Sequence, residues 1–159
     1  MPMMRIMDSY IICYIQDMGN VFTYIDYDKL PEGLSVEEMN NKAFENLSRD
    51  IRYRYEESKI SGIFGVLCGG DFEAEVLLFD GAWKNIADEF GDDLMIVVPT
   101  KDMVMFTKAS DKKLCKELLN RGRELFDSNQ KETPYLLFSK DIFIFSREES
   151  RMILQKKSL

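Results

Sequence analysis

The 159 residues predict one compact domain, and the 46 Leu, Ile, Val and Phe residues among them exceed the roughly 20% below which chains tend to stay disordered. The net charge of −7 disfavours binding to nucleic acid, because an acidic surface repels phosphate backbones. The absence of histidine excludes a Ser-His-Asp or Cys-His relay, a histidine metal ligand and imidazole acid–base chemistry.

The first third of the chain predicts a hairpin followed by a helix. We expect residues 1–8 to be disordered. Ser9–Gln16 and Val21–Tyr27 are rich in β-branched and aromatic residues and flank a Gly-Asn turn, which predicts two paired strands. A helix is expected over Ser35–Tyr55, because Ser35 and Glu38 have the spacing of a capping box and apolar residues follow at helical spacing.

The middle of the chain contains its clearest periodic signal. Gly62–Cys68 predicts an inner strand, and Asp71 is placed to cap the helix that follows. Apolar residues then recur at steps of three and four, and Gly91 is placed to end the helix. The residues of this stripe are Phe72, Val76, Phe79, Trp83, Ile86 and Phe90.

The last third predicts two hairpins on either side of a helix. Leu94–Val98 and Met103–Thr107 are apolar runs joined by a short turn. Ser110 is placed to cap the third helix, which Pro134 ends. The last predicted hairpin joins Tyr135–Phe138 to Ile142–Phe145, and residues 147–159 are expected to form a tail or a short helix.

These elements give the order ββαβαββαββ. Short turns between successive strands favour antiparallel pairing, and helices with one apolar stripe are expected to cover one face of the sheet. We therefore predict a single α+β domain over residues 1–159, with a mainly antiparallel sheet and three helices packed on it.

The cysteines and apolar runs indicate a cytoplasmic protein. Cys13, Cys68 and Cys115 lie far apart among apolar residues, which predicts reduced and partly buried thiols rather than a zinc site. No run of about 18 apolar residues is present, so we expect no membrane span, and the first residues lack the pattern of a signal peptide.

Carboxylates are concentrated between Asp71 and Asp93, where eight acidic residues accompany one base, Lys84. Such a cluster suits a divalent metal or an acid–base pair. On a helix, however, these side chains spread over several directions, and Glu75 is the one expected to be half-buried. Asp102 lies in a turn between two strands, a position found both at functional sites and in self-bonded turns. We predict no metal, no cofactor and no catalytic residue here.

Leu77 and Leu78 lie on the side of the second predicted helix that is opposite to the apolar stripe. A helix that covers one face of a sheet should be polar there, so these residues imply burial on both sides. Either another part of the chain or a second protein covers them.

The stretches Gly70–Leu78 and Gly91–Asp102, with Trp83 between them, resemble the YtpQ-type bacterial proteins, a family with a domain of unknown function. The stretch Leu34–Leu47 is similar to a helix of that family. The resemblance covers residues 30–107 and implies a cytoplasmic bacterial protein. The family brings no established activity, so the resemblance implies no catalytic residue.

The favoured function is that of a non-enzymatic module of adaptor or immunity type, which contacts another protein or a second copy of itself. The candidate partner-binding residues are Leu77, Leu78, Asp92, Asp93 and Asp102. The alternative is a metal-dependent or acid–base hydrolase that uses Glu75, Asp92, Asp93 or Asp102. An enzyme needs a pocket where two of these carboxylates converge, whereas a binding module needs an exposed apolar patch with an acidic rim.

Overall fold

The fold is seen in a computed structural model that describes residues 1–30, 32–70 and 73–155. Contacts between residues divide the chain into an N-terminal unit, Met1–Ile51, and a C-terminal unit, Arg52–Leu159. Three α-helices in this part of the chain, together with mainly antiparallel strands, confirm the predicted α+β class. The order of the elements follows the predicted order roughly.

The C-terminal unit contains one six-stranded sheet in the order β10-β9-β7-β8-β6-β5, and each neighbouring pair is antiparallel. The strand β7 lies near the centre and is buried over its whole length, as expected for an apolar strand covered on both faces. The strands are β5 (Arg54–Glu57), β6 (Phe64–Leu67), β7 (Leu94–Thr100), β8 (Met103–Lys108), β9 (Ile142–Ser146) and β10 (Arg151–Gln155).

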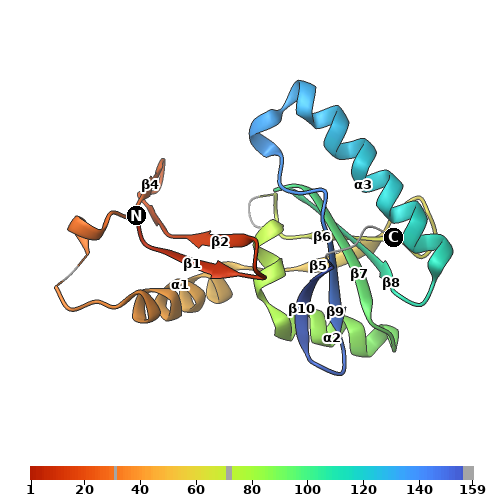
Figure 1. Ribbon diagram of the computed structural model, residues 1–159, viewed down its shortest axis with the longest axis horizontal. Coiled ribbons are helices and arrows are strands. Elements are labelled where there is room, and N and C mark those ends of the chain that lie inside the picture. Colours follow the sequence, from red (N-terminus) through yellow and green to blue (C-terminus); the bar gives the residue numbers. More distant parts are fainter. Residues whose placement is uncertain (31, 71–72, 156–159) are drawn as a thin grey trace. The chain divides into compact units, whose positions relative to one another are not determined.

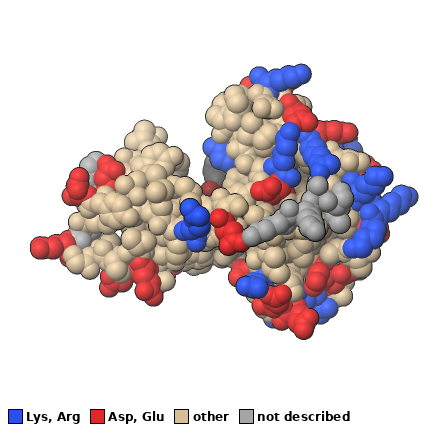
Figure 2. All heavy atoms as spheres, in the orientation of Figure 1, with Lys and Arg blue, Asp and Glu red and all other residues tan. Residues whose placement is uncertain are grey.

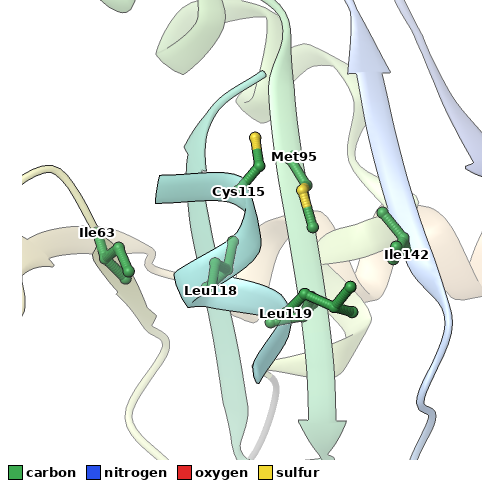
Figure 3. Packing of buried hydrophobic residues seen from close by; sticks show 7 residues of the cluster. Ile63, Met95, Cys115, Leu118, Leu119 and Ile142 are labelled. Carbon is green, nitrogen blue, oxygen red and sulfur yellow. The ribbon is translucent and has the colours of Figure 1, made fainter. Parts of the chain in front are cut away.

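The helix α3 (Lys112–Glu132) covers one face of this sheet. Gly122 allows the close approach, because an added Cβ would lie 3.2 Å from Cγ2 of Val97 on β7. Asp111, rather than the predicted Ser110, caps the helix and accepts a hydrogen bond from the Leu114 backbone N–H at 2.9 Å. The buried cluster in Figure 3 comprises Ile63, Met95, Val97, Cys115, Leu118, Leu119 and Ile142.

The helix α2 (Asp80–Phe90) covers the opposite face (Figure 1). Successive side chains of a strand point to opposite faces, so Ile96 points away from the cluster that contains Met95. Phe106 pairs with Ile96 and shares its face, and its ring meets Trp83 of α2 edge-on with centroids 5.8 Å apart. The expectation that the helices cover one face is therefore wrong, because β7 is apolar on both faces.

The stretch predicted as one helix over 72–90 is broken. A 3₁₀ helix, η2 (Ala74–Leu78), is followed by Phe79 with φ −102° and ψ 78°, and α2 begins only at Asp80. The break lets η2 bury Leu77 as well as Val76, which one continuous stripe would not allow. The predicted C-cap at Gly91 is confirmed, with φ 69° in the left-handed region. Phe72 and the predicted cap Asp71 lie outside the described residues.

Three short strands occupy segments for which the sequence predicted something else. Residues 1–8, where we expected disorder, contain β1 (Met3–Ile6), and the expected tail contains β10. The first predicted helix ends early, as α1 (Val36–Asp50), and β5 follows within its expected range. Charged residues in these strands interrupt the alternation of apolar and polar residues that would predict a strand. Each strand is instead stabilised by pairing with a neighbour, which the local sequence does not show.

The last predicted hairpin has a different first half. Residues 134–136 form the 3₁₀ helix η3 (Pro134–Leu136) instead of a strand, and β9 pairs with β10. Pro134 lies at the start of this turn, where its fixed φ is favourable. The segment after it runs beside the end of β7, since the Phe138 backbone N–H donates to the Pro99 carbonyl at 3.0 Å.

The N-terminal unit contains two small two-stranded sheets and α1. The sheets are β1 with β2 (Tyr10–Cys13) and β3 (Ile15–Asp17) with β4 (Phe22–Tyr24), which are followed by the 3₁₀ helix η1 (Tyr27–Lys29). The predicted capping box at the start of α1 is confirmed. The Ser35 hydroxyl accepts from the Glu38 backbone N–H at 3.1 Å, and Glu38 accepts from the Ser35 backbone N–H at 2.9 Å.

Candidate functional site

Three carboxylates of the acidic segment bind the C-terminal hairpin. Asp80 accepts a hydrogen bond from the Met152 backbone N–H at 3.0 Å, and Asp93 accepts one from the Arg147 backbone N–H at 2.9 Å. Asp88 forms an ion pair with the Arg147 guanidinium at 3.2 Å. These contacts join α2 and the start of β7 to β9 and β10, so they have a structural role.

Three of the four carboxylates proposed for the alternative hydrolase lie at the two ends of β7. Asp92 accepts a hydrogen bond from the Ser110 hydroxyl, and like Asp93 it precedes β7. Asp102 follows the other end of β7, and its carboxylate accepts from the Thr100 hydroxyl at 2.7 Å. A strand of this length spans roughly 20 Å. Asp92 and Asp93 therefore lie far from Asp102, and the sheet keeps these candidates from meeting in one pocket.

Leu77 and Leu78 do not form a free apolar face. Leu77 is 4% exposed, and Leu78 is half-buried. Of the two explanations that the sequence left open for Leu77, burial within the chain is the one seen in the structure. The two leucines thus offer little surface to a partner.

Glu73 is a buried carboxylate whose burial was not predicted from the sequence. It is 2% exposed, and its Oε1 accepts hydrogen bonds from the Cys68 backbone N–H at 2.9 Å and the Gly70 backbone N–H at 2.7 Å. Its Oε2 has no hydrogen-bond partner among the described residues. Glu73 therefore holds together the glycine turn between β6 and η2. The donors that Glu73 accepts from are backbone N–H groups, which leave no pattern in the side chains of the sequence.

Glu75 is half-buried, as the sequence predicted. Burial raises the pKa of its carboxyl group, a backbone hydrogen bond opposes that effect, the Glu73 charge adds to it and the Lys101 charge opposes it. The Ala74 backbone N–H donates to the Lys101 carbonyl at 2.9 Å, which fixes η2 beside the turn between β7 and β8.

We expect Glu75→Gln to stabilise the protein in a pH-dependent way. A carboxyl group whose pKa is higher in the folded state destabilises that state when it ionises, so stability falls as pH rises from the unfolded pKa through the folded pKa. Urea unfolding should show the variant to be more stable than wild type at about pH 8, with the gap closing below about pH 4. The exposed Glu148→Gln is the matched control, and an equal gap at both pH values would contradict this interpretation.

The cysteines are free thiols, as predicted. Burial, followed by the charges of Glu73 and Glu75, raises the pKa of the Cys68 thiol to about 11. At neutral pH this side chain is therefore a protonated thiol, whereas a catalytic cysteine needs a thiolate. No three Cys, Asp or Glu side chains within residues 1–30, 32–70 and 73–155 are placed to hold a metal ion. Within the same ranges, no helix is long and apolar enough to cross a bilayer.

The N-terminal unit leaves much of its apolar surface uncovered. Among its described residues only Pro2, Tyr14, Met39 and Ile51 are buried. We call the exposed apolar residues of its strands and turns the hairpin surface. They are Met3, Ile11, Ile15, Met18, Val21, Phe22 and Tyr24, each about half exposed or more.

The charge of the N-terminal unit is strongly acidic. It contains nine Asp and Glu residues and four Lys and Arg residues, so it supplies −5 of the net charge of −7. In the face shown in Figure 2, the part formed by this unit is a broad uncharged area with acidic side chains at its margin. Exposed apolar side chains such as those of the hairpin surface, in a unit with this acidic excess, are features expected of a binding module. This surface was not predicted from the sequence, where the available signal was the run of exposed-type positions occupied by apolar residues within 9–27.

No family model matches the chain, and no curated protein or solved structure is detectably similar to it. The resemblance to YtpQ-type proteins therefore stays a prediction, and the case for function depends on the geometry described above.

Proposed function

We propose that the chain is a non-enzymatic interaction module that binds another protein through the hairpin surface. The single observation that carries this proposal is the exposure of the large apolar side chains of β3 and β4, with Phe22 65% and Tyr24 63% exposed. Contiguous apolar side chains of this size mark an interaction site when they remain uncovered on a protein surface. Aromatic residues are also the side chains most enriched at the centres of protein interfaces.

The energetics of the N-terminal unit support the same proposal. An isolated two-stranded hairpin is marginally stable in water, and a 51-residue unit in which four of the described residues are buried has little core of its own. Cover from a partner would remove apolar surface from water at about 25 cal/mol per Å² and would stabilise the unit. Binding and ordering of this region are therefore coupled.

The net charge and the free cysteines of the chain limit which kinds of partner are compatible with this proposal. The acidic excess disfavours nucleic acid, and the free thiols fit a reducing compartment such as the cytoplasm. An adaptor and an immunity-type inhibitor both act by such contact, so both roles are compatible with this proposal.

Affinity capture from a lysate of the source organism, followed by reconstitution with the purified partner, tests the proposal. Phe22→Asp places a charge in the hairpin surface, and we expect it to weaken the reconstituted complex at least about a hundredfold, or about 2.7 kcal/mol. Tyr135→Asp is the matched control, because Tyr135 is 71% exposed but belongs to the C-terminal unit. Equal binding by wild type and Phe22→Asp would refute the proposal.

A further inference from the structure

The hairpin of β3 and β4 has one apolar face and a fixed register. Ile15 lies opposite Tyr24, and Asp17 lies opposite Phe22. Residues that are opposite one another, or two apart on a strand, point to the same face. These four side chains therefore share a face, and each belongs to an exposed residue.

The backbone of β4 also has an unused edge. The Ile25 backbone N–H donates to the Tyr14 carbonyl at 3.2 Å, and the Met18 backbone N–H donates to the Val21 carbonyl at 3.0 Å. Hydrogen-bonded and non-hydrogen-bonded residue pairs alternate along two antiparallel strands. The two hydrogen bonds above therefore determine which of the residue pairs between them are hydrogen-bonded. By that alternation the N–H and C=O groups of Phe22 and Tyr24 point away from β3.

A third strand is the structure that this edge lacks. Within the described part of the chain β3 and β4 form a two-stranded sheet, and such a sheet needs a third strand or a helix packed on its apolar face for independent stability. An extended segment added beside β4 would use the outward N–H and C=O groups and would cover Phe22 and Tyr24. Proteins commonly bind extended peptides by this addition of a strand.

The charges near β4 indicate which segment fits. The exposed Asp26 and Asp28 directly follow the strand. A second copy of the chain would bring another N-terminal unit with a charge of −5, which would repel the first. A segment that contains Lys or Arg would instead be attracted.

We propose that β4 binds an extended segment of a partner protein as a third strand, and that this segment alternates apolar residues with Lys or Arg. This inference rests on the proposed function and specifies how its site recognises the partner. The apolar residues would contact Phe22 and Tyr24, and the basic residues would supply the charge that the acidic unit lacks.

The test uses the full-length protein and two arrays of synthetic seven-residue peptides. Both arrays place Val, Ile, Leu, Phe or Tyr at alternate positions, and the remaining positions are Lys in one array and Glu in the other. We expect the best lysine peptides to bind at least about tenfold more tightly than their glutamate counterparts, a difference of about 1.4 kcal/mol. Failure of every lysine peptide to bind, or equal binding by both arrays, would overturn the inference.

A pair of variants separates strand addition from side-chain contact alone. Tyr24→Pro removes a backbone N–H that points outward, and Tyr24→Ala removes the same aromatic ring but keeps that N–H. We expect Tyr24→Pro to lose peptide binding. Tyr24→Ala should bind the peptide at least about fivefold more tightly than Tyr24→Pro does. Equal affinities of the two variants would overturn the strand-addition geometry. Amide signals of β3, followed by NMR, report whether each variant keeps the hairpin.

Two outcomes distinguish this inference from the proposed function. If no peptide binds but the captured partner still depends on Phe22, strand addition is wrong and the proposed function stands. If neither peptides nor a partner depend on Phe22, both are wrong. Sedimentation should also show a monomer over a wide concentration range. If the protein self-associates and Phe22→Asp abolishes this, a second copy covers the hairpin surface. That result would overturn the inference that the partner segment is basic.

Discussion

Trp83→Ala is expected to destabilise the protein by about 3–5 kcal/mol, the usual cost of emptying an aromatic site in a core. Trp83 is fully buried on the face of the sheet that α2 covers, and its ring meets Phe106. Its indole N–H also donates to the Val76 carbonyl at 2.9 Å, which joins α2 to η2 across the break. The substitution therefore removes packing and a buried hydrogen bond together.

Urea unfolding measures this effect, with two controls. Trp83→Phe keeps most of the ring packing but leaves the Val76 carbonyl without its donor, so we expect a smaller loss of about 1–3 kcal/mol. Tyr135→Ala, at an exposed aromatic residue, should change stability by no more than about 0.5 kcal/mol. A loss of less than about 1 kcal/mol for Trp83→Ala would contradict the packing of α2 on the sheet.

Glu73→Ala is expected to cost about 3 kcal/mol. The substitution removes the acceptor of two backbone N–H groups, those of Cys68 and Gly70, and a buried donor left without an acceptor costs about 1–3 kcal/mol. Glu73→Gln is the matched variant, because its amide oxygen can accept the same two hydrogen bonds in a side chain of the same size. We expect Glu73→Gln to lie within about 1 kcal/mol of wild type.

The same two variants distinguish a structural carboxylate from a functional one. Urea unfolding should rank wild type and Glu73→Gln close together and place Glu73→Ala well below them. If Glu73→Ala were as stable as wild type, the glycine turn would not depend on this side chain.

Local signals predicted two helix ends correctly. The capping box of Ser35 and Glu38 and the left-handed Gly91 are confirmed, because each depends on residues within one turn of the helix. Uninterrupted apolar runs likewise predicted β7 and β8, because a strand buried on both faces is apolar throughout. The short strands β1, β5 and β10 were missed, because each is stabilised by a partner strand rather than by its own residues.

The break at Phe79 shows why periodicity alone misled. The spacing of Val76, Trp83 and Ile86 fits one continuous helix, and the structure buries all three. The same stretch also buries Leu77, which lies on the other side of that helix in projection. Only the tertiary structure reveals that a change of axis at residue 79 satisfies both requirements.

The candidate site was the least predictable part. Asp92 and Asp93 looked like free acids in the sequence but bind Ser110 and the Arg147 backbone. The partners of such carboxylates lie far along the chain, so no local pattern shows them. The hairpin surface was missed for a different reason. The sequence predicted strands on both sides of the Gly-Asn turn, but the predicted strand Ser9–Gln16 is divided between β2 and β3, which belong to different sheets. No local pattern shows that Phe22 and Tyr24 stay 65% and 63% exposed.

Amide hydrogen exchange on the isolated full-length protein tests the central claim most directly. If β3 and β4 stay uncovered until a partner binds, their amides should exchange with little protection. The amides of β7 and β8 should exchange only through global unfolding. Protection of β3 and β4 as strong as that of β7 would mean that the hairpin is already covered in the free protein, and this would contradict the proposed function.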